Sequence, residues 1–157
     1  MALGLVLFSR MGRRSFAPIA LVLLIAACDS VEDRVAAHYE RAEALYAEGS
    51  TQKAVLEYRN ALQLDSEHAP SHMRMGEVAE EKGDLQAAFR RYKRVTEIDR
   101  ENYEARVKLT RFFTIADELT EAEESFEIAK ALRPDDIGTY ILRAAISLRQ
   151  DDLETMR

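Results

Sequence analysis

The strongest constraint on the fold is a 34-residue period that begins near Val35 and continues through the rest of the chain. Alanines recur at this interval, and an aromatic residue follows each alanine four positions later. The three pairs are Ala54 with Tyr58, Ala88 with Tyr92, and Ala122 with Phe126. Periods of roughly 20–50 residues are typical of solenoids, in which each unit buries its apolar face against the next. The sequence therefore predicts a linear array of repeated units.

Each unit is predicted to consist of two antiparallel helices. Within each half, apolar residues recur at intervals of three and four, as in an amphipathic helix. Gly49 and Gly83 lie between the halves, where a left-handed residue can end a helix, and Asp117 and Asp151 follow in later copies. We expect helices at residues 33–47, 52–64, 69–82, 85–98, 103–116, 119–132 and 137–149, and a further helix beginning at Asp152.

Small residues and helix caps support this pattern. Ser50 and Asp84 directly follow the two glycines and can cap the next helix. A column of small residues contains Ala42, Gly76 and Ala144, although Thr110 fills it less well. Small residues let neighbouring helices approach while an aromatic ring fills the remaining gap. Only 6 glycines and 3 prolines in 157 residues also favour long helices.

The alanine and aromatic columns, with Pro134 closing the third unit, resemble the tetratricopeptide repeat (TPR) family. The resemblance implies an all-α, right-handed α-solenoid of antiparallel helix pairs. Its units would be 35–68, 69–102, 103–136 and a partial fourth at 137–157. The sequence departs from the family pattern at several positions: Ser66 and Arg100 replace the closing proline, and His38, His72 and Arg106 replace a frequent tryptophan. The alternative is a bundle of unrelated helical hairpins, which the columns in register disfavour.

The fourth unit reaches only the start of its second helix. Met156 falls in the alanine column, so the register still continues at that point. We expect Ile141, Leu142 and Leu148 to be poorly covered. Either the protein dimerises through this end or the sequence is part of a longer array, and we favour the second interpretation.

A separate segment precedes the repeats. Residues 1–27 contain three arginines and no acid, and Arg13-Arg14 is followed by an apolar run that ends at Ala27. This run is shorter than the roughly 20 residues that span a bilayer, and it resembles a secretory signal peptide. Translation from Met11 would give a more regular signal. The stretch from Arg13 to Phe16 has a weaker resemblance to the twin-arginine export signal.

Residues 25–28, Ile-Ala-Ala-Cys, resemble the lipobox of bacterial lipoproteins. The resemblance implies that Cys28 is alkylated with diacylglycerol, that the chain is cleaved before it, and that residues 28–34 form a lipidated linker. It also implies a cell-envelope protein facing the periplasm, and Asp29 favours the inner membrane. Each buried methylene of an acyl chain contributes ~0.8 kcal/mol to membrane binding. The alternative is a free cysteine at the end of a hydrophobic helix.

Composition excludes several function classes. Residues 28–157 hold 19 basic and 28 acidic side chains, and this net charge of −9 should repel nucleic acid and anionic lipid. A single cysteine excludes a disulfide framework or a multi-thiolate metal site.

His68 and His72 have the spacing of helical metal ligands, but Pro70 between them marks a turn, so structural or surface roles are expected. The positive run from Arg90 to Arg94 is expected to expose its arginines around a buried tyrosine. No catalytic motif occurs, so we expect neither an enzyme nor a cofactor apart from the lipid.

The TPR resemblance implies a peptide-binding groove lined by the first helix of each unit. The candidate groove residues are Tyr39, Glu43, Tyr46, Met73, Glu77, Glu80, Glu81, Val107, Arg111, Thr114, Ile141, Ala145 and Leu148. Chaperone-binding TPR domains clamp a terminal carboxylate with a Lys/Asn/Arg set. Glu43 and Glu77 occupy the asparagine positions, so this clamp is expected to be absent. An apolar groove with an acidic centre would favour segments with apolar anchors and Lys or Arg. Alternatively, these glutamates form only a solvated face.

These observations predict a membrane-tethered scaffold that binds protein or peptide segments. The architecture resembles long lipoproteins of envelope assembly or extracellular polymer export. Neither nucleic acid nor a small-molecule substrate is expected. Two other interpretations remain open: a regulatory or docking arm of a longer enzyme with a catalytic domain beyond residue 157, and a structural spacer.

Overall fold

The computed structural model describes residues 30–155, which form seven α-helices and no β-strand. The helices are α1 (Val31–Ala47), α2 (Thr51–Leu64), α3 (Ala69–Glu81), α4 (Leu85–Ile98), α5 (Tyr103–Ile115), α6 (Leu119–Leu132) and α7 (Ile137–Thr155). The predicted signal segment and Cys28 lie outside the described residues. Within the described part, no helix has both the length and the apolar character needed to cross a membrane.

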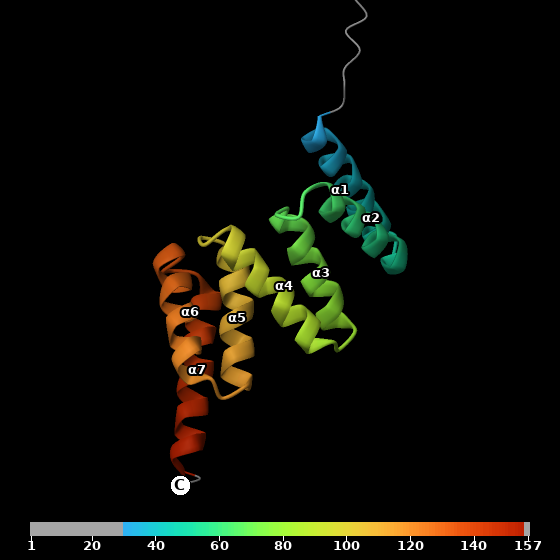
Figure 1. The fold of residues 1–157 in the computed structure, drawn as a ribbon. Coiled ribbons are helices and arrows are strands. Elements are labelled where there is room, and N and C mark those ends of the chain that lie inside the picture. Colours follow the sequence, from blue (N-terminus) through green and yellow to red (C-terminus); the bar gives the residue numbers. More distant parts are fainter. Residues whose placement is uncertain (1–29, 156–157) are drawn as a thin grey trace, which may run out of the picture.

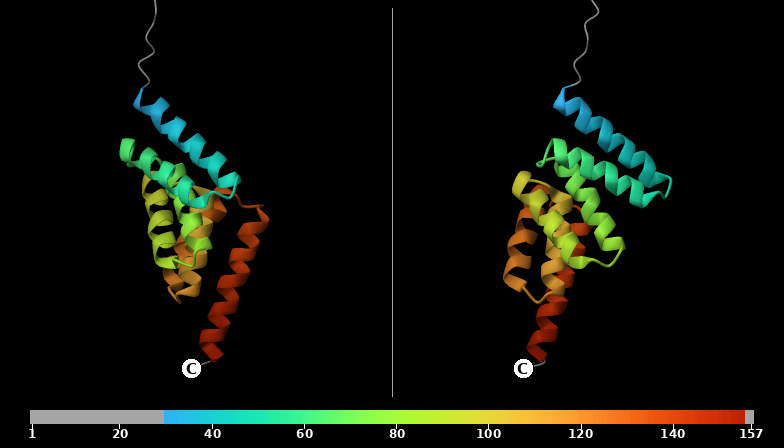
Figure 2. Two further views of the ribbon diagram at one scale, coloured as in Figure 1. Left: turned by 90° about the vertical axis from the view of Figure 1, so that its right-hand side faces the viewer. Right: turned by 45° about the vertical axis from the view of Figure 1, so that its right-hand side comes forward.

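Consecutive helices pack as antiparallel pairs, and the pairs stack in a line. The helices α1, α3 and α5 each pack mainly on the next helix, and α7 packs on both α5 and α6. Figures 1 and 2 show the stack, with α1 at one end and α7 at the other. The predicted all-α solenoid of helix pairs is therefore confirmed.

The repeated alanine and aromatic residues form the core of each pair. Ala54, Ala88 and Ala122 are fully buried, as are Tyr58 and Tyr92. Gly76 explains why its column needs small residues: a Cβ atom added there would lie 2.6 Å from Cε1 of Tyr92. The ring of the second helix thus rests on the backbone of the first.

The turns between paired helices require a left-handed residue. The φ angles are 77° at Gly49, 75° at Gly83 and 63° at Asp117, which confirms the role predicted from their spacing. Asp84 caps α4 by accepting a hydrogen bond from the backbone N–H of Ala87 at 3.0 Å. The equivalent cap expected at Ser50 is wrong, because its side chain makes no such bond. The N–H of Lys53, which such a cap would satisfy, donates instead to the backbone carbonyl oxygen of Ser50 at 3.0 Å.

The first helix begins two residues earlier than predicted because Ser30 caps it. The Ser30 hydroxyl accepts a hydrogen bond from the N–H of Asp33, and the Asp33 carboxylate accepts one from the N–H of Ser30, both at 3.0 Å. This reciprocal pair is a capping box. It satisfies two backbone groups at the point where the chain leaves the segment containing Cys28.

The last helix differs from the prediction. It runs without a break to Thr155, so the expected turn at Asp151 and the new helix at Asp152 are wrong. Asp117 makes the equivalent turn in the third unit, where α6 packs back on α5. Within residues 30–155 no second helix of the fourth unit lies against α7, so the helical hydrogen bonds continue past Asp151. Leu142 is only 3% exposed, contrary to expectation, because it packs on Ala122 and Phe126.

Candidate functional site

A groove runs along the first helices of the three complete units. Its larger part has a volume of about 550 Å³ and is lined by Tyr39, Ala69, Pro70, Met73, Arg74, Glu77, Asp99, Asn102, Glu104 and Lys108. A second hollow of about 350 Å³ is lined by Tyr46, Glu77, Glu80, Glu81 and Lys108. The two hollows share Glu77 and Lys108, and together they are called the groove below.

The structure brings six of the candidate residues to this groove: Tyr39, Tyr46, Met73, Glu77, Glu80 and Glu81. The others do not line either hollow. Val107 packs against the core around Phe126, while Arg111 is exposed on α5. On the same helix, Thr114 is buried and donates a hydrogen bond to the carbonyl of Thr110.

The three candidates on α7 also lie outside the groove. Ile141 and Leu148 are 62% and 67% exposed, and Ala145 is exposed as well. The helix α7 packs on α5 and α6, whereas both hollows are lined only by residues between Tyr39 and Lys108. The groove therefore spans the first three units.

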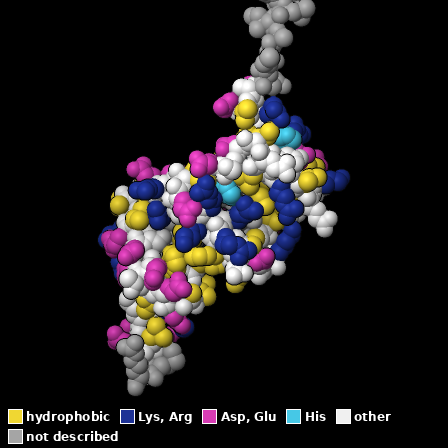
Figure 3. Space-filling view, in the orientation of Figure 1, with side chains coloured by type: hydrophobic (Ala, Val, Ile, Leu, Met, Phe, Trp, Pro, Cys, Tyr) yellow, Lys and Arg dark blue, Asp and Glu magenta, His cyan; other side chains and the backbone are white. Residues whose placement is uncertain are grey.

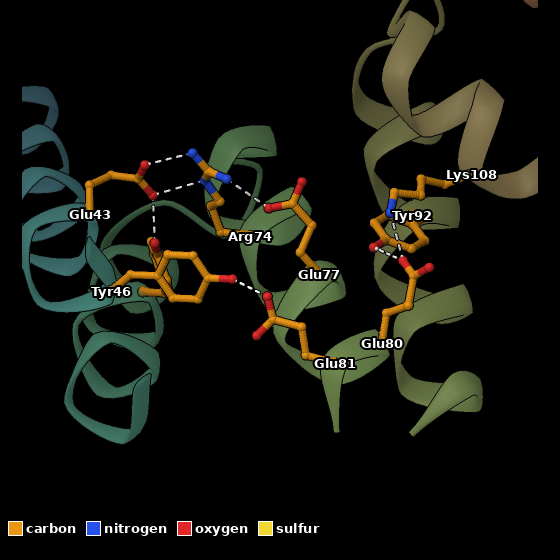
Figure 4. Close-up of polar contacts among 9 residues, drawn as sticks. Glu43, Tyr46, Arg74, Glu77, Glu80, Glu81, Tyr92 and Lys108 are labelled. Atoms are coloured by element: carbon orange, nitrogen blue, oxygen red, sulfur yellow. Dashed lines mark hydrogen bonds and ion pairs between the residues drawn. The ribbon is translucent and has the colours of Figure 1, made fainter. Parts of the chain in front are cut away.

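Glu43 joins the first unit to the second at the edge of the groove (Figure 4). Arg74 on α3 donates to it twice, from Nε to Oε1 at 3.0 Å and from Nη2 to Oε2 at 2.8 Å. The same guanidinium donates from Nη1 to Oε2 of Glu77 at 2.8 Å. The hydroxyl of Tyr58 also donates to Glu43. Arg74 thus holds one carboxylate from each of two neighbouring units.

A second set of contacts joins the second unit to the third. The carboxylate of Glu80 accepts hydrogen bonds from the Tyr92 hydroxyl at 2.8 Å and from Lys108 Nζ at 2.7 Å. Lys108 Nζ also lies 5.6 Å from the centre of the Tyr92 ring, within the range of a cation–π contact. Arg111 Nη1 is 3.9 Å from the other carboxylate oxygen. Figure 4 shows Glu80, Tyr92 and Lys108 meeting at one point.

The pKa shifts in this network reinforce the ordinary protonation states at neutral pH, with Glu80 and Arg74 charged and Tyr46 neutral. Burial raises the pKa of Glu80, but the hydrogen bonds from Lys108 and Tyr92 outweigh burial and hold it below its usual value. The hydrogen bond to Glu77 raises the pKa of Arg74. The hydrogen bond from Tyr46 to Glu81, together with burial, raises the pKa of the Tyr46 phenol to about 12. Permanent charges of this kind suit binding better than proton transfer, which needs a pKa near the working pH.

The two cations of the groove, Arg74 and Lys108, are not among the candidate residues predicted from the sequence. They are 34 residues apart and so share one column, one position after the column of Tyr39 and Met73. A basic residue at the same position in successive units was therefore a usable signal. Glu77 and Glu80 are hydrogen-bonded to these cations, so the interpretation of the glutamates as only a solvated face does not describe them.

The groove combines apolar and acidic surface. Tyr39, Pro70 and Met73 supply apolar area. Five carboxylates line it against two cations, and they belong to Glu77, Glu80, Glu81, Asp99 and Glu104. Glu104 is paired with Arg133 at 3.0 Å, and Glu77 and Glu80 are paired with the two cations of the groove. Glu81 and Asp99 therefore supply the negative charge that remains.

Both histidines of the third helix have structural roles. The imidazole of His68 accepts a hydrogen bond from the N–H of Ser71 and so caps α3. His72 is 7% exposed, and its Nε2 lies 3.1 Å from the carbonyl oxygen of Ser66. Among residues 30–155, no group of three or more His, Cys, Asp or Glu side chains is arranged to hold a metal ion.

Comparison with solved structures identifies the fold. The Arabidopsis OM64 TPR domain superposes with a TM-score of 0.65 and 19% sequence identity over 75% of this chain and 98% of that chain. The first TPR domain of Spaghetti (RPAP3), bound to the HSP90 peptide SRMEEVD, gives a TM-score of 0.67 and 14% identity over 75% and 94%. The chain has a TPR fold.

Another solved TPR domain is similar to the same extent. The second TPR domain of human RPAP3, in complex with the HSP70 peptide SGPTIEEVD, gives a TM-score of 0.65 and 16% identity over 75% of this chain and 98% of that chain. No protein-family model matches the sequence, and a search of curated proteins gives no significant match. The TPR assignment therefore rests on the repeat pattern and on the structure.

Proposed function

We propose that this TPR array is a membrane-tethered scaffold that binds segments of partner proteins in the groove. The observation that carries the proposal is the pair of adjoining hollows beside α1, α3 and α5, in which apolar side chains adjoin an excess of carboxylates. Two of the similar TPR domains are bound to peptides, which supports a peptide as the class of ligand.

The negative charge of the groove determines which charged residues a bound partner segment should carry. The peptides bound to those two TPR domains are acidic at their ends. Here Glu43 and Glu77 already occupy the guanidinium of Arg74, and the remaining carboxylates outnumber the cations. An extended segment that presents apolar side chains and Lys or Arg is complementary to this surface.

The tether in this proposal is an acyl-modified Cys28. Two or three acyl chains, at ~0.8 kcal/mol per buried methylene, would hold the domain on a membrane without help from its surface. The acidic surface of the repeats does not favour an anionic bilayer. The expected location is the bacterial cell envelope on the periplasmic side, in envelope assembly or polymer export.

The groove is tested with two fluorescein-labelled peptides of about twelve residues, one alternating Leu and Lys and the other alternating Leu and Glu. The full chain, purified in a non-ionic detergent, should bind the Leu/Lys peptide more tightly. The double variant Tyr39→Ala/Met73→Ala should weaken that binding about thirtyfold, since each truncation removes about 1 kcal/mol of apolar contact.

A matched control removes equally large side chains elsewhere. Leu56 and Tyr140 are 58% and 63% exposed and lie outside the groove, so Leu56→Ala/Tyr140→Ala should leave the affinity unchanged. Equal affinity of all three proteins for the Leu/Lys peptide would contradict the groove proposal and favour a structural spacer.

The tether is tested separately by metabolic labelling with a radioactive fatty acid in a bacterial host. The variant Cys28→Ser should lose both the label and the membrane association. Persistence of the label in this variant would refute the lipobox interpretation. In an enterobacterial host, Asp29→Ser should move the protein from the inner to the outer membrane fraction.

A further inference from the structure

The outer helices of the first two units carry a cluster of basic side chains that plays no part in the groove. Arg90, Arg91 and Lys93 belong to α4, and Arg59 belongs to the neighbouring α2. Figure 3 shows Lys and Arg side chains gathered over α4 and its neighbours, with apolar side chains beside them. This cluster is notable because residues 28–157 carry an excess of acid.

These four cations differ from the cations of the groove in having no acidic partner. Within residues 30–155, none of the four lies in an ion pair with a carboxylate, whereas Arg74 and Lys108 both do. Exposed cations without partners occur on most proteins. Here, however, Arg59 and Arg90 lie close enough to Arg91 to repel it. Arg94 in the same run does pair with acids, namely Glu67 and Glu97.

Arg91 is the most unusual member because it is half-buried. Its Nη1 lies 3.1 Å from Nδ1 of His72, and burial together with the nearby Arg59 and Arg90 lowers its pKa. The equivalent residue of the first unit is Glu57, which pairs with His38 at 2.6 Å. The second unit therefore has a cationic side chain, Arg91, at the position where the first unit has a carboxylate, Glu57. A partly desolvated guanidinium without a carboxylate is unfavourable, and an incoming carboxylate would relieve it.

An apolar pocket of about 310 Å³ lies at the start of α4. It is lined by Leu85, Gln86, Phe89, Phe112, Phe113, Ile115, Ala116 and Glu118. Phe89 forms edge-to-face contacts with Phe112 and Phe113, at centroid distances of 6.1 and 5.5 Å. At its rim, Leu85 and Ile115 are 52% and 72% exposed.

The pocket and the cluster are neighbours on α4. Gln86 at the pocket rim and Arg90 are four residues apart and so lie one above the other on the helix surface. Phe89 in the pocket wall directly precedes Arg90. A segment leaving the pocket over the outer face would therefore meet Arg90 within one helical turn. Arg91, which has both Arg90 and Arg59 as neighbours, lies farther across α4.

We propose that this outer surface is a second docking site, which binds an acidic segment of a partner protein carrying one apolar anchor residue. The anchor fills the pocket, and the carboxylates that follow it lie along Arg90, Arg91 and Arg59. This preference is opposite to that of the groove, so one array can hold two chemically different segments at once.

A protein segment fits this surface better than an anionic membrane does. In the next unit, the residue equivalent to Arg90 is Glu124, and the outer helix α6 also exposes Glu121. A flat bilayer in contact with α4 would meet these carboxylates as well. A short segment contacts only the basic part.

The probe is a fluorescein-labelled peptide of about ten Asp and Glu residues with one Phe near its amino terminus, and the control peptide has Ser in place of Phe. The full chain in detergent should bind the Phe peptide about tenfold more tightly than the Ser peptide, and high salt should weaken both. The variant Arg59→Glu/Arg90→Glu should lower the affinity for the Phe peptide by at least about tenfold. The variant Ile115→Glu should remove the advantage of Phe over Ser.

Two further variants make the result specific. The variant Arg34→Glu/Lys82→Glu changes the net charge by the same amount as Arg59→Glu/Arg90→Glu. Both residues are exposed and form no ion pair within the described part of the chain. This variant should retain its affinity for the Phe peptide. The groove variant Tyr39→Ala/Met73→Ala should also bind the acidic peptide normally. The proposed outer docking site and the proposed groove function are therefore tested independently. Thermal melting checks that each variant is folded.

Three outcomes would overturn the proposal. The first is equal affinity of Arg59→Glu/Arg90→Glu and its charge-matched control for the Phe peptide. The second is binding to phosphatidylglycerol vesicles, lost in Arg59→Glu/Arg90→Glu, without binding to the peptide; this would identify a membrane surface. The third is self-association at low salt that the same variant abolishes, again without peptide binding, which would identify the acidic face of α6 in a second copy.

Discussion

Arg74 of the second unit holds Glu43 of the first through two hydrogen bonds of 3.0 and 2.8 Å, which join Nε to Oε1 and Nη2 to Oε2. Both side chains are about one-third exposed. Successive units of this solenoid are thus joined by polar contacts beside the groove as well as by apolar packing. The groove residues therefore influence the geometry of the array in addition to lining its surface.

The first prediction concerns this pair. Glu43→Gln, Arg74→Met and the double variant form a double-mutant cycle measured by urea denaturation. We expect a coupling free energy of about 0.5–1 kcal/mol, in the range of partly exposed ion pairs, and a smaller value in high salt. As a control, a cycle between Glu43 and the distant Arg34 should be additive. Additivity of Glu43 and Arg74 would show that the bidentate pair does not couple the units in solution.

The second prediction concerns the contact between Gly76 and Tyr92. Gly76→Ala should lower the free energy of unfolding by about 1–2 kcal/mol, because overpacking outweighs the better helix propensity of alanine. The new Cβ would be 2.6 Å from the fully buried ring of Tyr92. Ala144 occupies the same column in the last unit but is exposed, so Ala144→Val should change stability by less than about 0.5 kcal/mol. A stabilised Gly76→Ala protein would show that the two helices separate easily.

The third prediction concerns pH. Burial lowers the pKa of His68 and of His72 below the usual value, and Arg91 adds repulsion at His72. Below about pH 6.5 the unfolded chain binds protons that the folded chain does not, so stability should fall as the pH decreases through this range. His72→Gln keeps a donor near Ser66 and should flatten the pH dependence measured by urea denaturation between about pH 7.5 and 5.5. An unchanged slope would mean that His72 charges freely in the folded protein.

The fourth prediction concerns the two faces of α7. Leu142 is 3% exposed, whereas Ile141 beside it is 62% exposed. Leu142→Lys should destabilise the protein by more than about 3 kcal/mol, because it buries a charge, while Ile141→Lys should change stability by less than about 0.5 kcal/mol. Chemical denaturation of the full chain measures both. A large loss from Ile141→Lys would show that this face of α7 is covered in solution.

Much of the fold could be predicted from residue types that recur at the 34-residue interval. The 34-residue spacing of Ala54, Ala88 and Ala122 places three fully buried residues correctly. The left-handed turns at Gly49 and Asp117 also follow from their register. These features are local or strictly periodic, so the same backbone solution recurs in each unit.

The candidate groove could be predicted only in part. Tyr39 and Met73 share one column, which faces the groove in the first two units. In the third unit Val107 of the same column packs instead against the core around Phe126. Arg74 and Lys108 repeat at one position of successive units, but this spacing does not show which residues their side chains contact. Long flexible side chains reach across from that column to acids in the preceding unit.

The sequence by itself determined the helices, their pairing and the repeat that stacks them, because periodic burial of small and aromatic residues permits few other arrangements. Only the tertiary structure decided which charges meet. The bond between Arg74 and Glu43, the lack of a carboxylate beside Arg91 within the described residues and the continuation of α7 past Asp151 all depend on how neighbouring helices lie in space. Those distances arise from packing between units, and a 34-residue spacing does not encode them.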